Sequence, residues 1–166
     1  NPPVATIPGG ASYTVRVARL AARPAPQELS YRLIIYEIPK PVDPNNPNEG
    51  VSMVLRTSMP VFVADESAKA KLAWTAWQDT QGLHVQVVNS GQRHAKLSDL
   101  SLAPDGGQAG SFGKGLNGYV LAGATRQFDL KPASDKPLPT LSGASVALSA
   151  QNIDQPVKER VVVETR

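Results

Sequence analysis

The stretch VSMVLRTSMPVFV, residues 51–63, alternates apolar and polar side chains through its first half. Val51, Met53 and Leu55 share one parity, and this period of two predicts a β-strand. The preceding residues 39–50, PKPVDPNNPNEG, are rich in Pro and Asn and predict a loop. A row of outward apolar side chains on an ordinary edge strand promotes aggregation. The outward apolar side chains of this strand therefore indicate a functional role.

The composition is that of a globular chain built from short elements. The 166 residues are 41% hydrophobic, with 15 Pro and 13 Gly dispersed along the chain, which favours short strands joined by turns. The chain has no cysteine, which excludes a disulfide framework and thiolate metal ligands. The net charge of +3 is scattered, whereas nucleic-acid binders concentrate positive charge on one face. No apolar run reaches the ~18 residues of a membrane span. We therefore expect neither nucleic-acid binding nor membrane insertion.

Strand signals recur along the chain at intervals of roughly 8–12 residues, as in β-sandwiches. No long segment keeps the apolar spacing of a helix, so no helix is predicted. Leu97, Leu100 and Leu102 change parity, which predicts a β-bulge near Ser98–Asp99. Residues 104–118 predict a loop. The strands are expected at 12–20, 29–38, 51–63, 72–77, 83–89, 95–103, within 119–130 as two short strands, and at 144–152 and 158–164.

The strands divide into two groups around a polar segment. ADESAKAK, residues 64–71, lacks large apolar side chains and is interpreted as a hinge between domains. Residues 66–166 supply the roughly seven strands of an immunoglobulin-like sandwich. Residues 1–65 supply only three, too few to bury both faces of a sheet. We expect an all-β chain of two immunoglobulin-like β-sandwich domains, the first of them incomplete in this chain or completed by something else.

Motifs that would support catalysis are incomplete. GKGLNG, residues 113–118, has the spacing of a dinucleotide-binding glycine motif, but a strand follows it where that motif requires a helix. His84 and His94 have no carboxylate at metal-ligand spacing and are expected to be hydrogen-bonded or solvated. Ser98 and Asp99 lie too close to His94 on one strand to form a catalytic triad with it. We therefore expect no enzymatic activity, no cofactor and no metal site.

Two tryptophans leave a second interpretation open. Trp74 and Trp77 lie three residues apart in an expected strand, hence on opposite faces. We expect one of them in the core and the other partly exposed, where it could stack on a sugar. The alternative function is accordingly a pilin-like or cell-surface β-sandwich that acts as an adhesive or carbohydrate-binding module.

The order of these segments resembles one known family. The chain contains, in order, PPVATIPGGASYTVRV (2–17), ELSYRLIIYEIP (28–39), VSMVLRTSMPVFV (51–63), LHVQVVNSGQRHAKLSDLSL (83–102) and GYVLAGATRQFDL (118–130). Together they resemble the periplasmic pilus-assembly chaperones of the chaperone–usher pathway, the PapD-like family. The combination of Y-R-L-x-x-x-E-I-P with N-S-G-x-R-H-A is its most specific feature. The resemblance covers nearly the whole chain and implies that the first strands of the N-terminal domain are missing from it.

The resemblance implies a function without chemistry. Pilus subunits of this pathway have an immunoglobulin-like fold that lacks its last strand, and the chaperone fills the open groove with a strand of its own, a form of strand addition. By the resemblance this donor strand carries Val51, Met53, Leu55 and Thr57. The implied partners are a pilus subunit and an outer-membrane usher, with self-dimers when the chaperone is free, and the implied location is the periplasm.

The sequence departs from the family where the subunit's terminal carboxylate is held. Well-known members use an arginine on the first strand of the domain and a lysine on the donor strand. By the resemblance the first strand is missing from this chain, and the lysine position on the donor strand holds Pro60. Arg16 and Arg56 are the candidate carboxylate anchors, because a guanidinium can bind a carboxylate bidentately; a surface ion pair is the alternative for both. Glu28 matches an acidic residue of an interdomain salt-bridge cluster, although its usual arginine partner is replaced by Ala64.

Overall fold

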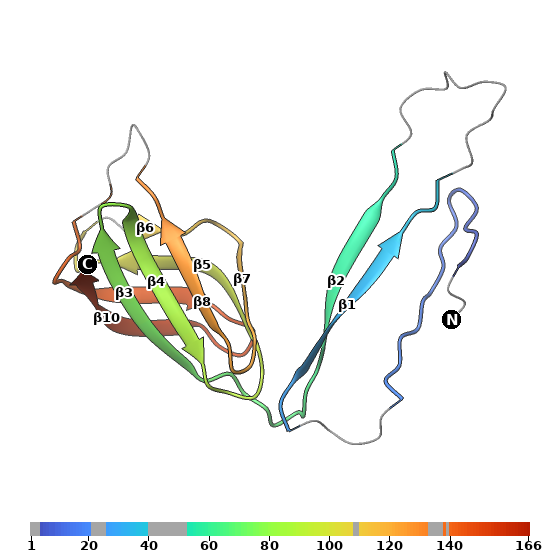
Figure 1. The fold of residues 1–166 in the computed structure, drawn as a ribbon, viewed down its shortest axis with the longest axis horizontal. Helices are drawn as coiled ribbons and strands as arrows, with labels where there is room; N and C mark the ends of the chain where they lie inside the picture. The colour runs from blue at the N-terminus through green and yellow to red at the C-terminus, as the bar shows by residue number, and fades with distance from the viewer. Residues whose placement is uncertain (1–3, 21–25, 40–52, 108–109, 133–137, 139) are drawn as a thin grey trace.

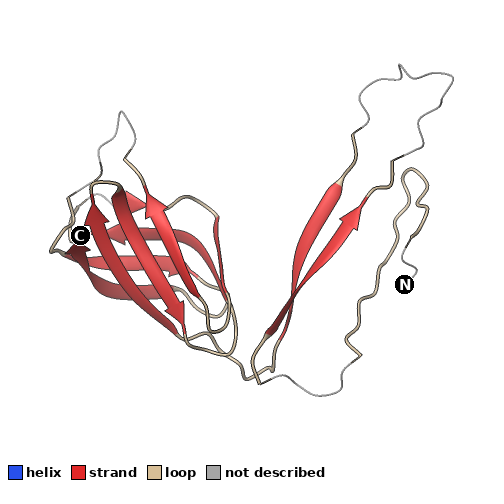
Figure 2. Cartoon of the chain, in the orientation of Figure 1, coloured by secondary structure: helices blue, strands red, loops and turns tan. Residues whose placement is uncertain are grey.

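The computed structural model describes residues 4–20, 26–39, 53–107, 110–132, 138 and 140–166 (Figure 1). All regular elements in these ranges are β-strands, so the prediction of an all-β, immunoglobulin-like sandwich fold is confirmed (Figure 2). The described ranges contain no helix that is long and apolar enough to span a membrane.

Strands β1 (Leu29–Tyr36) and β2 (Arg56–Val63) form a two-stranded antiparallel sheet. Their register runs from Leu29 opposite Val63 to Tyr36 opposite Arg56. Because side chains alternate across a strand, one face of this sheet is apolar along both strands. It carries Leu29, Tyr31, Leu33, Ile35, Met59, Val61 and Val63, together with Thr57 opposite Ile35.

The remaining strands form a sandwich that joins the β1–β2 sheet at one end (Figure 1). One layer holds β4 between β3 and β8, and the other holds β5 and β9, with β6 and β7 paired to β5. Strand β10 connects the layers, since it pairs antiparallel with β9 and then parallel with β3. The strands are β3 (Leu72–Asp79), β4 (Gly82–Asn89), β5 (Ala95–Ala103), β6 (Gly110–Ser111), β7 (Leu116–Val120), β8 (Thr125–Leu130), β9 (Ser145–Gln151) and β10 (Val157–Thr165).

The core lies between the two layers of the sandwich. In β9 the side chains of Val146, Leu148 and Ala150 are buried and their neighbours in the strand are exposed, as expected for a strand with one solvated face. They meet the fully buried side chains Leu83, Val85, Val87, Leu97, Leu100, Leu102 and Val163. Leu97 and Leu100 are both buried because the strand register shifts between them, so the predicted bulge is confirmed.

Three expectations about strands are wrong. Residues 12–20 form no strand, because no described segment supplies a hydrogen-bonded ladder for them. Strand β2 begins at Arg56 rather than at residue 51; residues 53–55 lie outside the strand, and residues 51–52 lie outside the described ranges. The expected loop 104–118 contains β6 and the start of β7, whose short segments pair with β5.

Candidate functional site

The residues before β2 present apolar side chains to solvent. Met53 is 83% exposed and Leu55 is 72% exposed, and Thr57 in β2 is exposed as well. Leu55 is tied to the end of β1, because its carbonyl accepts a hydrogen bond from the Glu37 amide at 2.8 Å. Val51 lies outside the described residues. The described part of the expected donor strand is therefore a row of solvated side chains joined to β2.

The outer edge of β2 is unpaired in the described chain. β1 is the only described strand that pairs with β2, so the other edge of β2 offers free backbone N–H and C=O groups. Such an edge is a template for a strand from another chain. Met53 and Leu55, whose side chains are exposed, lie in the three residues that immediately precede β2.

A second group of residues joins the β1–β2 sheet to the sandwich. It is the junction loop, residues 89–94, of sequence NSGQRH. Asn89 is fully buried; its Oδ1 accepts from the amides of Lys71 at 3.1 Å and Gly91 at 3.0 Å. Its Nδ2 donates to the carbonyls of Arg93 at 2.8 Å and Val120 at 3.0 Å. One amide thus holds the loop, the segment before β3 and the end of β7 together.

Glycine is required within the junction loop. A Cβ at Gly91 would overlap the backbone of Lys69 and Lys71. The close approach allows Ser90 N to donate to Lys71 O at 2.9 Å and Gln92 N to donate to Lys69 O at 3.0 Å. The loop therefore lies directly on the segment that leads from β2 to the sandwich.

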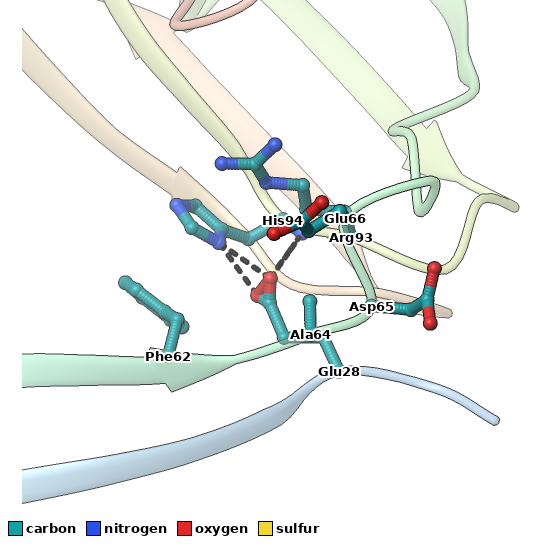
Figure 3. A pocket seen from close by; sticks show the side chains of 7 residues that line it. All are labelled: Glu28, Phe62, Ala64, Asp65, Glu66, Arg93 and His94. Atoms are coloured by element: carbon teal, nitrogen blue, oxygen red, sulfur yellow. Dashed lines mark hydrogen bonds and ion pairs between the residues drawn. The ribbon is translucent and has the colours of Figure 1, made fainter. Parts of the chain in front are cut away.

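The end of the loop binds Glu28, just before β1 (Figure 3). The His94 amide donates to both carboxylate oxygens at 3.2 and 3.0 Å, and the ring Nδ1 lies 2.5 and 2.7 Å from them. The Phe62 ring of β2 stacks on the His94 ring with centroids 3.7 Å apart and planes at 22°. Glu28 lies where the resemblance expects an interdomain contact, and its partner in the structure is His94.

A cavity of about 280 Å³ lies between the β1–β2 sheet and the sandwich, beside Pro60. The β1–β2 sheet contributes Arg32 to its lining, and the sandwich contributes Tyr119 and Arg126. Ser30, Tyr31, Phe62 and Leu121 complete the lining, which contains no Asp or Glu. The cavity therefore carries two positive charges and apolar walls, a combination that suits an anion attached to an apolar chain.

Arg126 is held in place by the backbone of β7. Its guanidinium donates to the carbonyls of Tyr119 at 3.0 Å and Asn117 at 3.3 Å, and it lies 5.2 Å from the centre of the Phe128 ring. Gly118 makes room for it, because a Cβ there would overlap the guanidinium. Two backbone bonds leave further N–H groups of Arg126 for a ligand, since a guanidinium carries five donors.

The sequence predicted Arg16 and Arg56 as candidate carboxylate anchors. Arg16 lies in the exposed segment 4–20, and Arg56 lies at the exposed start of β2, opposite Tyr36. Neither lines the cavity. Arg126 was missed because it is brought to Pro60 only by the packing of the sandwich against the β1–β2 sheet. Arg32 has a sequence signal, because it lies within the Y-R-L-x-x-x-E-I-P segment.

A third cluster surrounds His84 in the sandwich. Its Nδ1 is 2.6 Å from Asp129 and its Nε2 is 3.1 Å from Asp79. Burial lowers the pKa of His84, but the hydrogen bonds to Asp129 and Asp79 outweigh this desolvation and leave the pKa raised. The Trp77 ring stacks on the His84 ring, and the Arg166 guanidinium carbon lies 4.3 Å from the centre of the Trp77 ring. No three His, Asp or Glu side chains of the described chain are placed to hold a metal ion.

The expectation of a partly exposed tryptophan is wrong. Trp74 is 9% exposed in the core, and Trp77 on the opposite face is 8% exposed. Trp77 is buried despite facing outward, because His84 and Arg166 cover its ring. Neither indole offers the open face that stacking on a sugar requires.

Comparison with known proteins finds a family match for the first part of the chain. No curated protein matches the chain. Residues 1–68, which include β1, β2 and Glu28, match the family model described as the pili and flagellar-assembly chaperone, PapD N-terminal domain. The match covers 68 of the 166 residues and shows that this part of the chain is similar to the N-terminal domain of the PapD-like pilus-assembly chaperones.

Proposed function

We propose that this protein binds a pilus subunit in the periplasm by donor-strand complementation and delivers it to an outer-membrane usher. Residues 1–65 form the subunit-binding domain in this proposal, and residues 66–166 form the second domain. The observation that carries the proposal is the exposed pair Met53 and Leu55 beside the unpaired edge of β2. Residues 51–57 would add a strand to the subunit, and Val51, Met53, Leu55 and Thr57 would enter its groove.

The energetics favour such a contact over an exposed edge. Burying Met53 or Leu55 stabilises the complex by roughly 1.5–3 kcal/mol each, because both are solvated in the free protein. Backbone hydrogen bonds along the strand add affinity that depends little on the subunit's sequence. Without a subunit the same edge is an aggregation hazard, which would favour self-dimers of the free chaperone.

The cavity beside Pro60 is the proposed site for the subunit's terminal carboxylate. Arg32 and Arg126 line it from both sides and no lining residue carries a negative charge. A guanidinium can hold a carboxylate through two parallel hydrogen bonds. Arg16 and Arg56 remain the alternative anchors.

The donor strand is tested with Met53→Asp and its matched control Val54→Asp. Val54 is adjacent, half exposed and of the opposite parity, so its side chain would point away from the groove. We expect Met53→Asp to weaken binding of a strand-deficient pilin by roughly a hundredfold or more, because it places a charge in an apolar groove. Val54→Asp should bind within a few fold of the parent. Titration calorimetry measures both; equal affinities for the two variants would refute the assignment.

The adhesive interpretation is tested in the same preparation. A 1:1 complex with the strand-deficient pilin supports the chaperone. Absence of that complex, together with retention on a glycan array, would favour the carbohydrate-binding module. The burial of Trp74 and Trp77 argues against the second outcome.

A further inference from the structure

The contact between Glu28, Phe62 and His94 joins two parts of the chain that are otherwise separate sheets. Glu28 precedes β1 and Phe62 lies on β2, whereas His94 ends the junction loop before β5. The Glu28 amide also donates to Gln92 O at 3.0 Å. The β1–β2 sheet is thus held to the sandwich through both of its strands.

The contact is buried and specific in its partners. The side chains of His94 and Glu28 are 6% and 3% exposed. A carboxylate at such burial needs hydrogen-bond partners, and His94 supplies its amide and its ring. Arg93 lines the same pocket, but its Nη1 lies 3.5 Å from Asp154 of the sandwich. His94 is therefore the residue on which Glu28 depends.

The same contact adjoins the cavity beside Pro60. Phe62 stacks on His94 and also lines that cavity together with Arg32. Tyr119 lies 5.4 Å from the Phe62 ring and 5.6 Å from the His94 ring, and it lines the cavity from the sandwich side. Because the cavity is built from both sheets, its shape depends on the angle at which they are held.

We propose that His94 is a positioning residue that fixes the angle between the β1–β2 sheet and the sandwich and thereby brings Arg32 and Arg126 to one cavity. The Glu28 carboxylate locks the imidazole, and the locked ring holds β2 through Phe62. The part of this inference that concerns binding rests on the proposed function.

The test uses a pair of labels, one on each side of the contact. The chain has no cysteine, so Ser58→Cys on β2 and Lys158→Cys on β10 provide two unique sites, both exposed. Spin labels on this pair report the distance between the two sheets. We expect one narrow distance distribution in the labelled parent and a distribution at least about twice as wide in His94→Ala.

His84→Ala is the matched control. His84 is also buried, stacked on an aromatic ring and paired with carboxylates, but all its partners lie within the sandwich. The control should keep the narrow distribution. A narrow distribution in His94→Ala, or equal broadening in His84→Ala, would overturn the proposal. If His94→Ala does not fold, as judged by the fluorescence of Trp74 and Trp77, Glu28→Gln tests the same lock with a smaller change and must also broaden the distribution.

Binding of the strand-deficient pilin separates this inference from the proposed function. We expect His94→Ala to weaken binding by roughly tenfold, because the cavity is displaced, whereas Met53→Asp should weaken binding by roughly a hundredfold or more and leave the label distance unchanged. Broadening without weaker binding in His94→Ala would overturn the link to the cavity. Absence of binding by the parent would refute the proposed function, and the label distance would still decide whether His94 holds the two sheets.

Discussion

Asn89→Ala tests whether the junction loop is organised by one buried amide. The Asn89 side chain is fully buried and makes four hydrogen bonds, to Lys71 N, Gly91 N, Arg93 O and Val120 O. Alanine removes all four and supplies no replacement. The segment before β3, the loop and the end of β7 each lose a contact in this single change.

The magnitude follows from where the four partners lie. Val120 is 1% exposed, so its carbonyl is left without a partner in the interior, at a cost of about 1–3 kcal/mol. The other three bonds are partly buried, and each contributes about 0.5–1.5 kcal/mol net, since water replaces them in part. We therefore expect Asn89→Ala to lower the free energy of unfolding by about 2.5–7.5 kcal/mol, a large fraction of the stability of an ordinary domain.

Guanidinium titration with tryptophan fluorescence measures this loss, because Trp74 and Trp77 both lie on β3 of the sandwich. Asn152→Ala is the control: its Oδ1 accepts one exposed hydrogen bond, from Lys96 N at 3.1 Å, and should cost less than about 1 kcal/mol. If the two variants differ by less than about 1 kcal/mol, the reasoning about the buried amide is wrong.

Two further predictions concern charge. The pKa of His84 is raised in the folded protein, so its pairing with Asp129 and Asp79 stabilises fully below the unfolded value of about 6.5 and is lost as the pH rises through the folded-state pKa. In the parent we expect Tm to fall as the pH rises above about 6.5, and in His84→Gln we expect this fall to be smaller. Calorimetry measures Tm at each pH, and an unchanged dependence of Tm on pH in the variant would contradict the prediction. Arg126→Gln should weaken binding of the subunit by roughly tenfold and should not change binding of a subunit with an amidated C-terminus. If Arg56→Gln weakens binding and Arg126→Gln does not, the carboxylate anchor is Arg56 on β2.

Local pattern was sufficient for most of the sandwich. The alternation of β9 is visible in the sequence, because this strand has one buried face. The bulge in β5 was predictable because three leucines change parity, and Asp99 at φ 53 relieves the mismatch. The segment 12–20 shows the limit of the same reasoning. Its alternation is as clear as that of β9, but a strand also needs a hydrogen-bonded neighbour.

The candidate sites depended on contacts that sequence spacing does not encode. His94 was expected to be hydrogen-bonded or solvated, but its spacing gave no partner, because Glu28 lies 66 residues earlier in the chain. The burial of Trp77 requires a ring from β4 and a guanidinium from Arg166, the last residue of the chain. Each of these contacts brings together residues that are adjacent only after the sheets have formed.

Pro60 follows the same logic and bears on how a ligand would be held. Arg32 stands directly opposite Pro60 in the β1–β2 register, and the guanidinium of Arg126 reaches the same cavity from the sandwich. A proline cannot donate a backbone hydrogen bond, but β2 tolerates it because one edge of that strand is unpaired in the described chain. Because the positive charge of the cavity comes from Arg32 on β1 and Arg126 on β8, a ligand held by both residues requires the β1–β2 sheet and the sandwich to keep their relative orientation. A protein of this design would lose affinity when the contact at His94 opens, even with the donor strand intact.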